Sequence, residues 1–218
     1  MFQIFLILFL SSFFSLPLKA HPVVYKGGFV YWGQFSHHSN TQRMSYTFHP
    51  RFAFETNRAF YHNFKNYRDA KIGFNALLKR WALEDSQGNI YVGVHGGRYR
   101  QAGSNTQSDT ESNTEGRVLH SMIEADWESR ELYTTLSVAS FHLDDKNVEK
   151  LSYRIGFAPY VVGMDALQTW MIFQFDYFKE IKDRVKITPM MRFFYKNALW
   201  EMGANFQSEF FLTLMVHY

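Results

Sequence analysis

The sequence predicts an all-β fold, a closed antiparallel transmembrane β-barrel of about ten strands, with eight and twelve strands as alternatives. Apolar and polar residues alternate along many segments, and aromatic residues make up 19% of a chain whose mean hydropathy is −0.28. Aromatic girdles around a polar interior are typical of transmembrane barrels. No stretch after residue 20 approaches a helical span, so only a closed barrel could carry this chain through a bilayer.

The last eleven residues, Ser208 to Tyr218, show the alternation most clearly. One parity is entirely apolar or aromatic and comprises Phe210, Leu212, Leu214, Val216 and Tyr218. The other parity is mixed, so one face of the strand suits lipid and the other tolerates water. A strand of this kind that ends on an aromatic residue resembles the closing strand of Gram-negative outer-membrane β-barrels. The resemblance implies that the barrel-assembly machinery is a partner and binds through these five residues.

The N-terminus predicts export to the cell outer membrane. Residues 1–20 read as a signal peptide, because an apolar run from Phe2 to Leu10 is followed by Leu18-Lys19-Ala20, with cleavage after Ala20. An uncleaved anchor is the alternative, although the run is short of the ~20 residues that a spanning helix needs. Residues 21–218 then form the barrel domain. The chain has no cysteine, which excludes disulfides and a lipid-modified N-terminal cysteine.

Nine further strands are expected from the same alternation. They cover residues 23–36, 45–56, 70–83, 89–101, 116–128, 132–143, 151–161, 166–178 and 184–195. Pro50 interrupts the second of them, which weakens that assignment. With both termini on one side, the connections 57–68 and 102–115 fall on the same side as the termini, whereas long loops usually lie opposite. Either the usual rule fails here or one hairpin is misplaced, near residues 128–132 or in the second strand. A soluble β-sandwich or lipocalin-like barrel is the structural alternative.

The charge balance bears on function. Lys19 is the only charged residue among residues 1–20, so the 23 basic residues of the chain fall to 22 after cleavage, against 20 acidic ones. This near-neutrality argues against nucleic acid as a partner. We expect a non-enzymatic barrel without a cofactor, with an envelope-structural, ligand-binding or small-solute role. The cations expected on the inward parity are Arg51, Lys71, Lys79, Arg154, Lys186 and Arg192, and they must pair with Glu55, Glu124, Asp126, Asp176 or Glu209 or with water.

One short motif suggests an enzyme instead. His37-His38-Ser39-Asn40 resembles the catalytic segment of outer-membrane phospholipase A and of the lipid A deacylases. The resemblance implies a lipid acylhydrolase with Ser39 as nucleophile and His37 as its general base. Residues two apart on a strand face the same way, and this pair shares the lipid-facing parity of Phe29 and Phe35, which suits a lipid substrate. Thr41 follows where those families typically have glycine, and the neighbouring strand positions offer no carboxylate. The alternative is a polar extracellular loop.

Two other groups of residues could bind ligands. His95, His120 and Glu124 fall on the inward parity, and imidazole with carboxylate suits Zn, Cu or Ni, although a structural network is the alternative. The parity also places His49, Asp126 and His217 in the lumen. The segment from Asn57 to Arg68 is both aromatic and basic. It could contact lipid head groups or lipopolysaccharide phosphate, or pack against the barrel rim.

Overall fold

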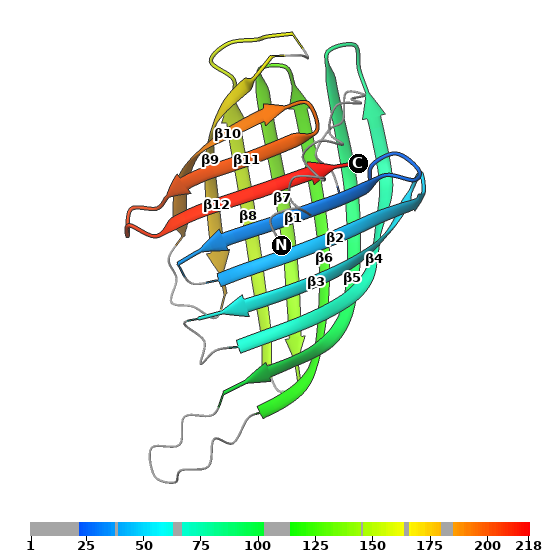
Figure 1. The fold of residues 1–218 in the computed structure, drawn as a ribbon, viewed down its shortest axis with the longest axis vertical. Helices are drawn as coiled ribbons and strands as arrows, with labels where there is room; N and C mark the ends of the chain where they lie inside the picture. The colour runs from blue at the N-terminus through cyan, green and yellow to red at the C-terminus, as the bar shows by residue number, and fades with distance from the viewer. Residues whose placement is uncertain are drawn as a thin grey trace, which may run out of the picture.

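The structure, a computed structural model, describes residues 22–37, 39–62, 67–102, 114–144, 146–163, 166–179 and 185–218. The predicted signal peptide lies outside these residues. The described part forms a closed antiparallel barrel of twelve strands (Figure 1). The strands are β1 (Phe29–Ser36), β2 (Ser39–His49), β3 (Phe52–Tyr61), β4 (Tyr67–Ala82), β5 (Ser86–Gln101), β6 (Thr114–Ser129), β7 (Leu132–Leu143), β8 (Lys146–Phe157), β9 (Gln168–Phe178), β10 (Lys186–Tyr195), β11 (Ala198–Ala204) and β12 (Phe210–His217).

Each strand pairs with its sequence neighbours, and β12 pairs with β1 to close the barrel. Tyr31 lies opposite Val216 and Phe35 lies opposite Leu212. The final residue is held as well, because Tyr218 and Phe29 exchange two backbone hydrogen bonds of 2.8 Å. The prediction that the C-terminal segment is the closing strand is confirmed.

The predicted number of about ten strands is wrong, because the sequence reading missed two hairpins. Residues 45–56 were expected to form one strand, but β2 ends at His49 and β3 begins at Phe52. Pro50 lies in this turn, where its missing N–H and fixed φ end the ladder. The second missed hairpin turns at Lys196, whose φ of 52° lies in the left-handed region. Neither glycine nor proline marks that turn, so β11 went unrecognised.

The corrected count resolves the conflict over loop length. With twelve strands, Gln101 at the end of β5 and Thr114 at the start of β6 lie at the end of the barrel opposite the termini. Most of the expected connection 57–68 is strand, since β3 runs to Tyr61 and β4 begins at Tyr67. The misplaced hairpin is the one formed by β2 and β3, which were predicted from the sequence as a single second strand.

The barrel is apolar outside and polar inside. Outward side chains such as Ile72, Val94 and Leu119 are exposed, whereas inward Thr47, Asn75 and Thr213 are completely buried. A water-soluble barrel has the opposite arrangement, because its apolar face forms the core. Among the described residues, no helix is long and apolar enough to cross a membrane.

Candidate functional site in the barrel lumen

A cavity of 260 Å³ lies inside the barrel and is lined mainly by polar and charged side chains. Its charged lining comprises Arg43, Lys71, Lys150, Arg154 and Arg192 as cations, with Glu55, Glu124 and Glu201 as carboxylates and His120 beside them. These residues occupy the inward parity of their strands, because side chains alternate across each strand. Ligand sites are commonly such concavities with a few convergent polar groups.

On one wall of the cavity, two arginines share a single buried carboxylate. The side chain of Glu201, on β11, is 1% exposed. Its Oε1 lies 2.6 Å from Nη2 of Arg192, and its Oε2 lies 3.4 Å from Nη1 of Arg154. The guanidinium of Arg192 also stacks on the ring of Tyr133, with 4.3 Å from its central carbon to the ring centroid. Because one carboxylate meets two guanidinium groups, this wall keeps a net positive charge.

Both arginines were predicted to face inward and pair with carboxylates, and this is confirmed. Glu201 was missed because its strand was missed. The pattern that could have revealed this strand is the alternation of Leu199, Glu201 and Gly203 with Trp200 and Met202. Two residues expected inside, Arg51 and Lys79, are instead exposed. Arg51 lies in the turn after β2, and a register shift in β4 between Leu77 and Lys79 changes the alternation.

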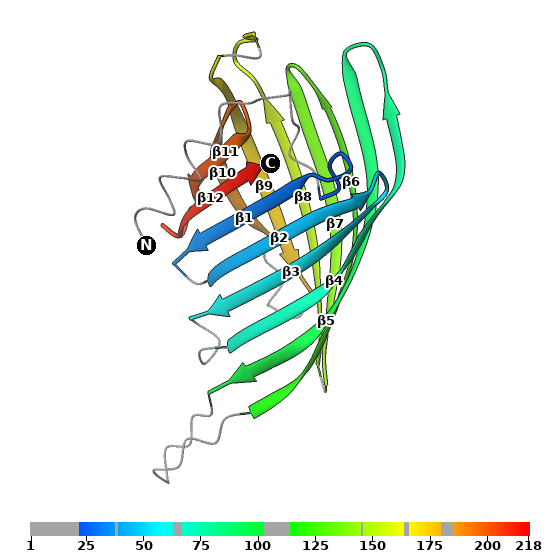
Figure 2. The same cartoon turned by 45° about the vertical axis from the view of Figure 1, so that its right-hand side comes forward.

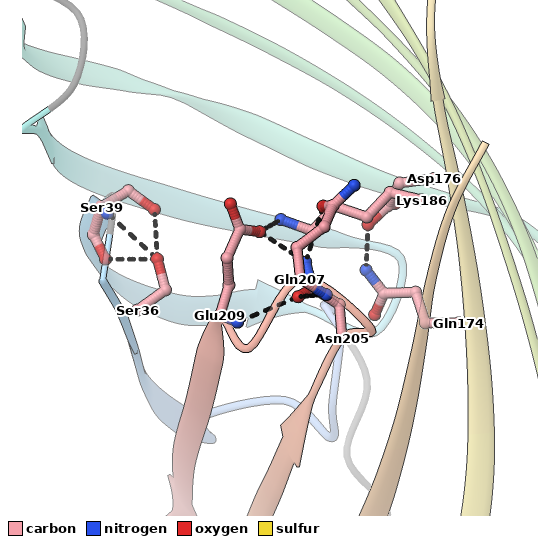
Figure 3. A network of polar contacts seen from close by, with 8 residues as sticks. All are labelled: Ser36, Ser39, Gln174, Asp176, Lys186, Asn205, Gln207 and Glu209. Carbon is pink, nitrogen blue, oxygen red and sulfur yellow. Dashed lines mark hydrogen bonds and ion pairs between the residues drawn. The ribbon is translucent and has the colours of Figure 1, made fainter. Parts of the chain in front are cut away.

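Two more ion pairs tie the strands from β8 to β12 together, at the end of the barrel opposite the termini. Nζ of Lys150 lies 3.0 Å from Oδ1 of Asp176, which also accepts a hydrogen bond of 2.7 Å from Ser152. Lys186 pairs with Glu209, and the two belong to the sets of inward cations and carboxylates expected from the sequence. Figure 3 shows this pair beside Asn205 and Gln207, with Gln174 donating to Asp176 nearby. The network crosslinks neighbouring strands inside the barrel.

The opposite wall holds a pair of histidines. His95 on β5 and His120 on β6 lie directly opposite, with 3.2 Å between their Nδ1 atoms. Glu55 lies 3.7 Å from Nε2 of His95 and accepts a hydrogen bond of 2.8 Å from Asn75. Gly73 makes room for this pair, because a Cβ there would lie 2.7 Å from the His95 ring. One imidazole must donate and the other accept for this hydrogen bond to form.

The structure brings together only part of the predicted metal site. The two imidazoles are adjacent, as predicted, but the described residues contain no group of three or more histidines, cysteines or carboxylates that could hold a metal. Glu124 therefore does not complete a three-ligand set with them. Asp126 and His217 are buried on the inward parity as expected, whereas His49 is exposed at the end of β2. A register shift between Thr47 and His49 turns that imidazole out of the lumen.

The first described residues also enter the lumen. Pro22 lines the cavity, and Val23 is completely buried in a cluster with Ala53, Leu77 and Tyr91. The backbone here is hydrogen-bonded to the barrel wall. Its contacts are Ser45 Oγ to Pro22 O at 3.2 Å, Val24 N to Thr47 Oγ1 at 3.2 Å and Arg80 Nη2 to Val23 O at 3.4 Å. The segment narrows the lumen at the end where the termini lie.

Among solved structures, the fold is similar to that of the KdgM porin, with a TM-score of 0.52 at 10% identity over 88% of this chain and 98% of that chain. The chain has the fold of an outer-membrane β-barrel. A KdgM porin in complex with disordered oligogalacturonate matches with the same values. Outer-membrane expressed OmpT of Vibrio cholerae has a TM-score of 0.39 at 11% identity, over 94% of this chain and 100% of that chain. No protein-family model and no curated protein matches the sequence.

On this outer-membrane fold, the residues of the acylhydrolase motif do not share one strand. β1 ends at Ser36 and β2 begins at Ser39, so His37 lies in the turn between them, and His38 lies outside the described residues. Ser39 belongs to the inward parity of β2, not to the lipid-facing parity that the sequence suggested. Its hydroxyl lies 3.1 Å from that of Ser36 (Figure 3). The geometry expected for a nucleophile and its base on one strand face is therefore not the one observed.

Proposed function

We propose that this protein is an outer-membrane β-barrel of a Gram-negative cell that passes small polar solutes through its lumen. The observation that carries the proposal is the polar cavity of 260 Å³ inside a closed barrel with an apolar exterior. The apolar exterior fits a bilayer, and the polar interior fits water and solutes. The similarity to the KdgM porin supports the fold on which the proposal depends.

The size of the cavity limits the solute. A volume of 260 Å³ is slightly below the roughly 300–1,000 Å³ of typical ligand pockets, so small solutes fit it best. Five cationic side chains line the cavity against three carboxylates. Arg154 and Arg192 offer guanidinium donors that match carboxylate geometry. Small carboxylated solutes are therefore the first class to test, and oligogalacturonate belongs in the panel because one neighbour was solved with it.

The test is reconstitution of purified, folded protein in planar bilayers and liposomes. A shift in gel mobility between unheated and heated samples establishes that the barrel is folded. We expect discrete conductance steps, together with liposome swelling in small neutral and carboxylated solutes. Folded protein that gives neither conductance nor swelling would overturn the solute role and leave the envelope-structural role.

We also propose that the barrel-assembly machinery recognises β12. Phe210, Leu212, Leu214, Val216 and Tyr218 lie on the outward parity of this strand, which completes the barrel only by pairing with β1. Tyr218→Ala should therefore reduce folded protein in the outer membrane of cells but allow refolding in detergent, where no machinery is present. Phe206→Ala is the control, because Phe206 is a more exposed aromatic residue outside the closing strand. Equal assembly of both variants in cells would contradict the proposal.

A further inference from the structure

Five arginines gather on the outer surface of the barrel where β3, β4, β5 and β6 reach the end opposite the termini. They are Arg58, Arg68, Arg98, Arg100 and Arg117, and all five are exposed. We call this group the arginine patch. Its members share the outward parity with the exposed apolar residues Ile72, Val94 and Leu119 of the same strands. Figure 2 shows the four strands side by side.

The strand register places like charges directly opposite one another. Arg68 on β4 pairs with Arg100 on β5, and Arg98 on β5 pairs with Arg117 on β6. Side chains at directly opposite positions begin ~5 Å apart at their Cβ atoms, and like charges there destabilise a sheet. Two such pairs lie two residues apart along β5. Their positive charges repel one another, and a bound anion would reduce this repulsion.

The described residues compensate this charge only in part. The Asp144 carboxylate accepts hydrogen bonds of 3.2 and 3.4 Å from the backbone N–H of Arg117 but forms no salt bridge with its guanidinium. Glu115 pairs with Arg100, with 2.7 Å from its Oε1 to Nε of the arginine. The guanidinium of Arg68 lies over the ring of Phe60 at 4.7 Å, a contact that leaves its outer N–H groups available. In the described part of the chain, no carboxylate forms a salt bridge with Arg58, Arg68, Arg98 or Arg117.

The position of the patch identifies the anion. Arg117 lies two residues from Leu119, and Arg98 lies four residues from Val94, so the arginines begin where the exposed apolar surface ends. In a membrane this is the depth of the lipid head groups. β5 ends at Gln101 and β6 begins at Thr114 at this end, and in transmembrane barrels the strand ends that carry the longer connections are on the outer side. Guanidinium groups bind phosphate through paired hydrogen bonds.

We propose that the arginine patch is a binding site for the phosphorylated head group of a lipid in the outer leaflet. The acyl chains of that lipid would lie against Ile72, Val94 and Leu119 while its phosphates bridge the paired arginines. A soluble polyanion would use the arginines but not the adjoining apolar surface. The proposal depends on the membrane placement given above but not on conduction through the lumen.

The experiment measures lipid binding by the full, detergent-solubilised protein with native mass spectrometry. The probes are lipid A carrying both phosphates, lipid A with the phosphates removed, and inorganic pyrophosphate. A triple variant, Arg68→Gln with Arg98→Gln and Arg117→Gln, removes one arginine from each like-charge pair and the second arginine from one of them. Its matched control is Arg51→Gln with Lys79→Gln and Arg130→Gln, three exposed cations near the opposite end of the barrel.

We expect the wild-type protein and the control to bind phosphorylated lipid A equally, and the triple variant to bind it at least about tenfold more weakly, since it has lost three of the five guanidinium groups that attract the phosphates. Dephosphorylated lipid A and pyrophosphate should bind far more weakly than the phosphorylated lipid. Equal lipid binding by the triple variant, or pyrophosphate binding as tight as lipid binding, would overturn the proposal. Heat-dependent gel mobility is recorded for every variant, so a misfolded barrel or failed membrane placement is distinguished from a lost site. Conductance of the triple variant, measured separately, should match that of the wild type.

Discussion

The guanidinium of Arg80 reaches the backbone carbonyl of Val23, 3.4 Å away and 57 residues earlier in the chain. The same guanidinium bonds Asn89 at 2.6 Å and the hydroxyl of Tyr91 at 3.3 Å. One side chain therefore links the N-terminal segment to two residues of the barrel wall. This contact keeps Val23 and Pro22 inside the lumen.

Replacing Arg80 should widen the passage. In Arg80→Gln the segment loses a long hydrogen bond of 3.4 Å from an exposed guanidinium, so we expect a loss of about 0.5–1.5 kcal/mol, the range of an ordinary hydrogen bond. We expect larger single-channel conductance steps and a lower unfolding midpoint in urea. Lys79→Gln is the control, because among the described residues this neighbouring cation forms no hydrogen bond to Pro22, Val23 or Val24. Conductance that stays at the wild-type value in Arg80→Gln would mean that the segment does not limit the passage.

Removing the carboxylate shared by two arginines should be costly. Glu201→Gln leaves Arg154 and Arg192 without their counter-charge, and breaking a buried ion pair in this way costs about 3–5 kcal/mol. We expect that loss in urea titrations of the refolded barrel, together with a reversal potential shifted toward anions. Glu84→Gln, in the exposed turn after β4, should change neither quantity. Unchanged stability in Glu201→Gln would show that the triad is not a stabilising centre.

An arginine introduced at an outward position should lower the free energy of unfolding, as it does on the lipid-facing surface of other barrels. Val94 is 56% exposed near the middle of β5, and Leu83 is 65% exposed in the turn after β4. Val94→Arg should cost about 2–4 kcal/mol in lipid vesicles, and Leu83→Arg about 0–1 kcal/mol, because the penalty falls toward the interface. Denaturant titrations in vesicles measure both changes. Similar costs at the two positions would contradict the proposed membrane placement.

Chelation should leave the barrel unchanged. His95 and His120 supply two nitrogens, fewer than the three or four protein ligands of most zinc sites. We therefore expect EDTA to leave the unfolding midpoint of the wild-type protein where it is, as in His120→Gln. A midpoint that falls with EDTA only in the wild type would restore the metal site predicted for His95, His120 and Glu124.

The acylhydrolase hypothesis has a direct assay. Because the Ser39 hydroxyl interacts with Ser36 and His37 lies in the turn before β2, we expect no phospholipase or lipid A deacylase activity above that of Ser39→Ala. Assays at equal amounts of folded protein, with Thr41→Ala as a control variant, measure this. Hydrolysis by the wild type and the control but not by Ser39→Ala would establish Ser39 as the nucleophile.

Much of the architecture could be predicted from local patterns. Period-2 alternation is a property of each strand by itself, so Phe210 to Tyr218 revealed a closing strand before any partner was known. Hairpins are harder to find, because a turn can be built without glycine. Lys196 adopts a positive φ, which is uncommon for lysine and so cannot be predicted from its residue type. The alternation of apolar and polar residues also continues after it. Pro50 did mark its turn, and a stricter reading of that residue would have recovered one hairpin.

The sequence by itself determined an all-β chain, the lipid-facing and inward parities of most strands, and an inward set of charges that includes Arg154, Arg192 and His95. Only the tertiary structure decided which of these charges meet. Glu201 approaches Arg154 from a strand 47 residues away, and Arg68 faces Arg100 only because β4 and β5 pair in one register. Such contacts depend on strand count, register and closure of the barrel. A shift of one residue would turn every side chain of a strand to the other face.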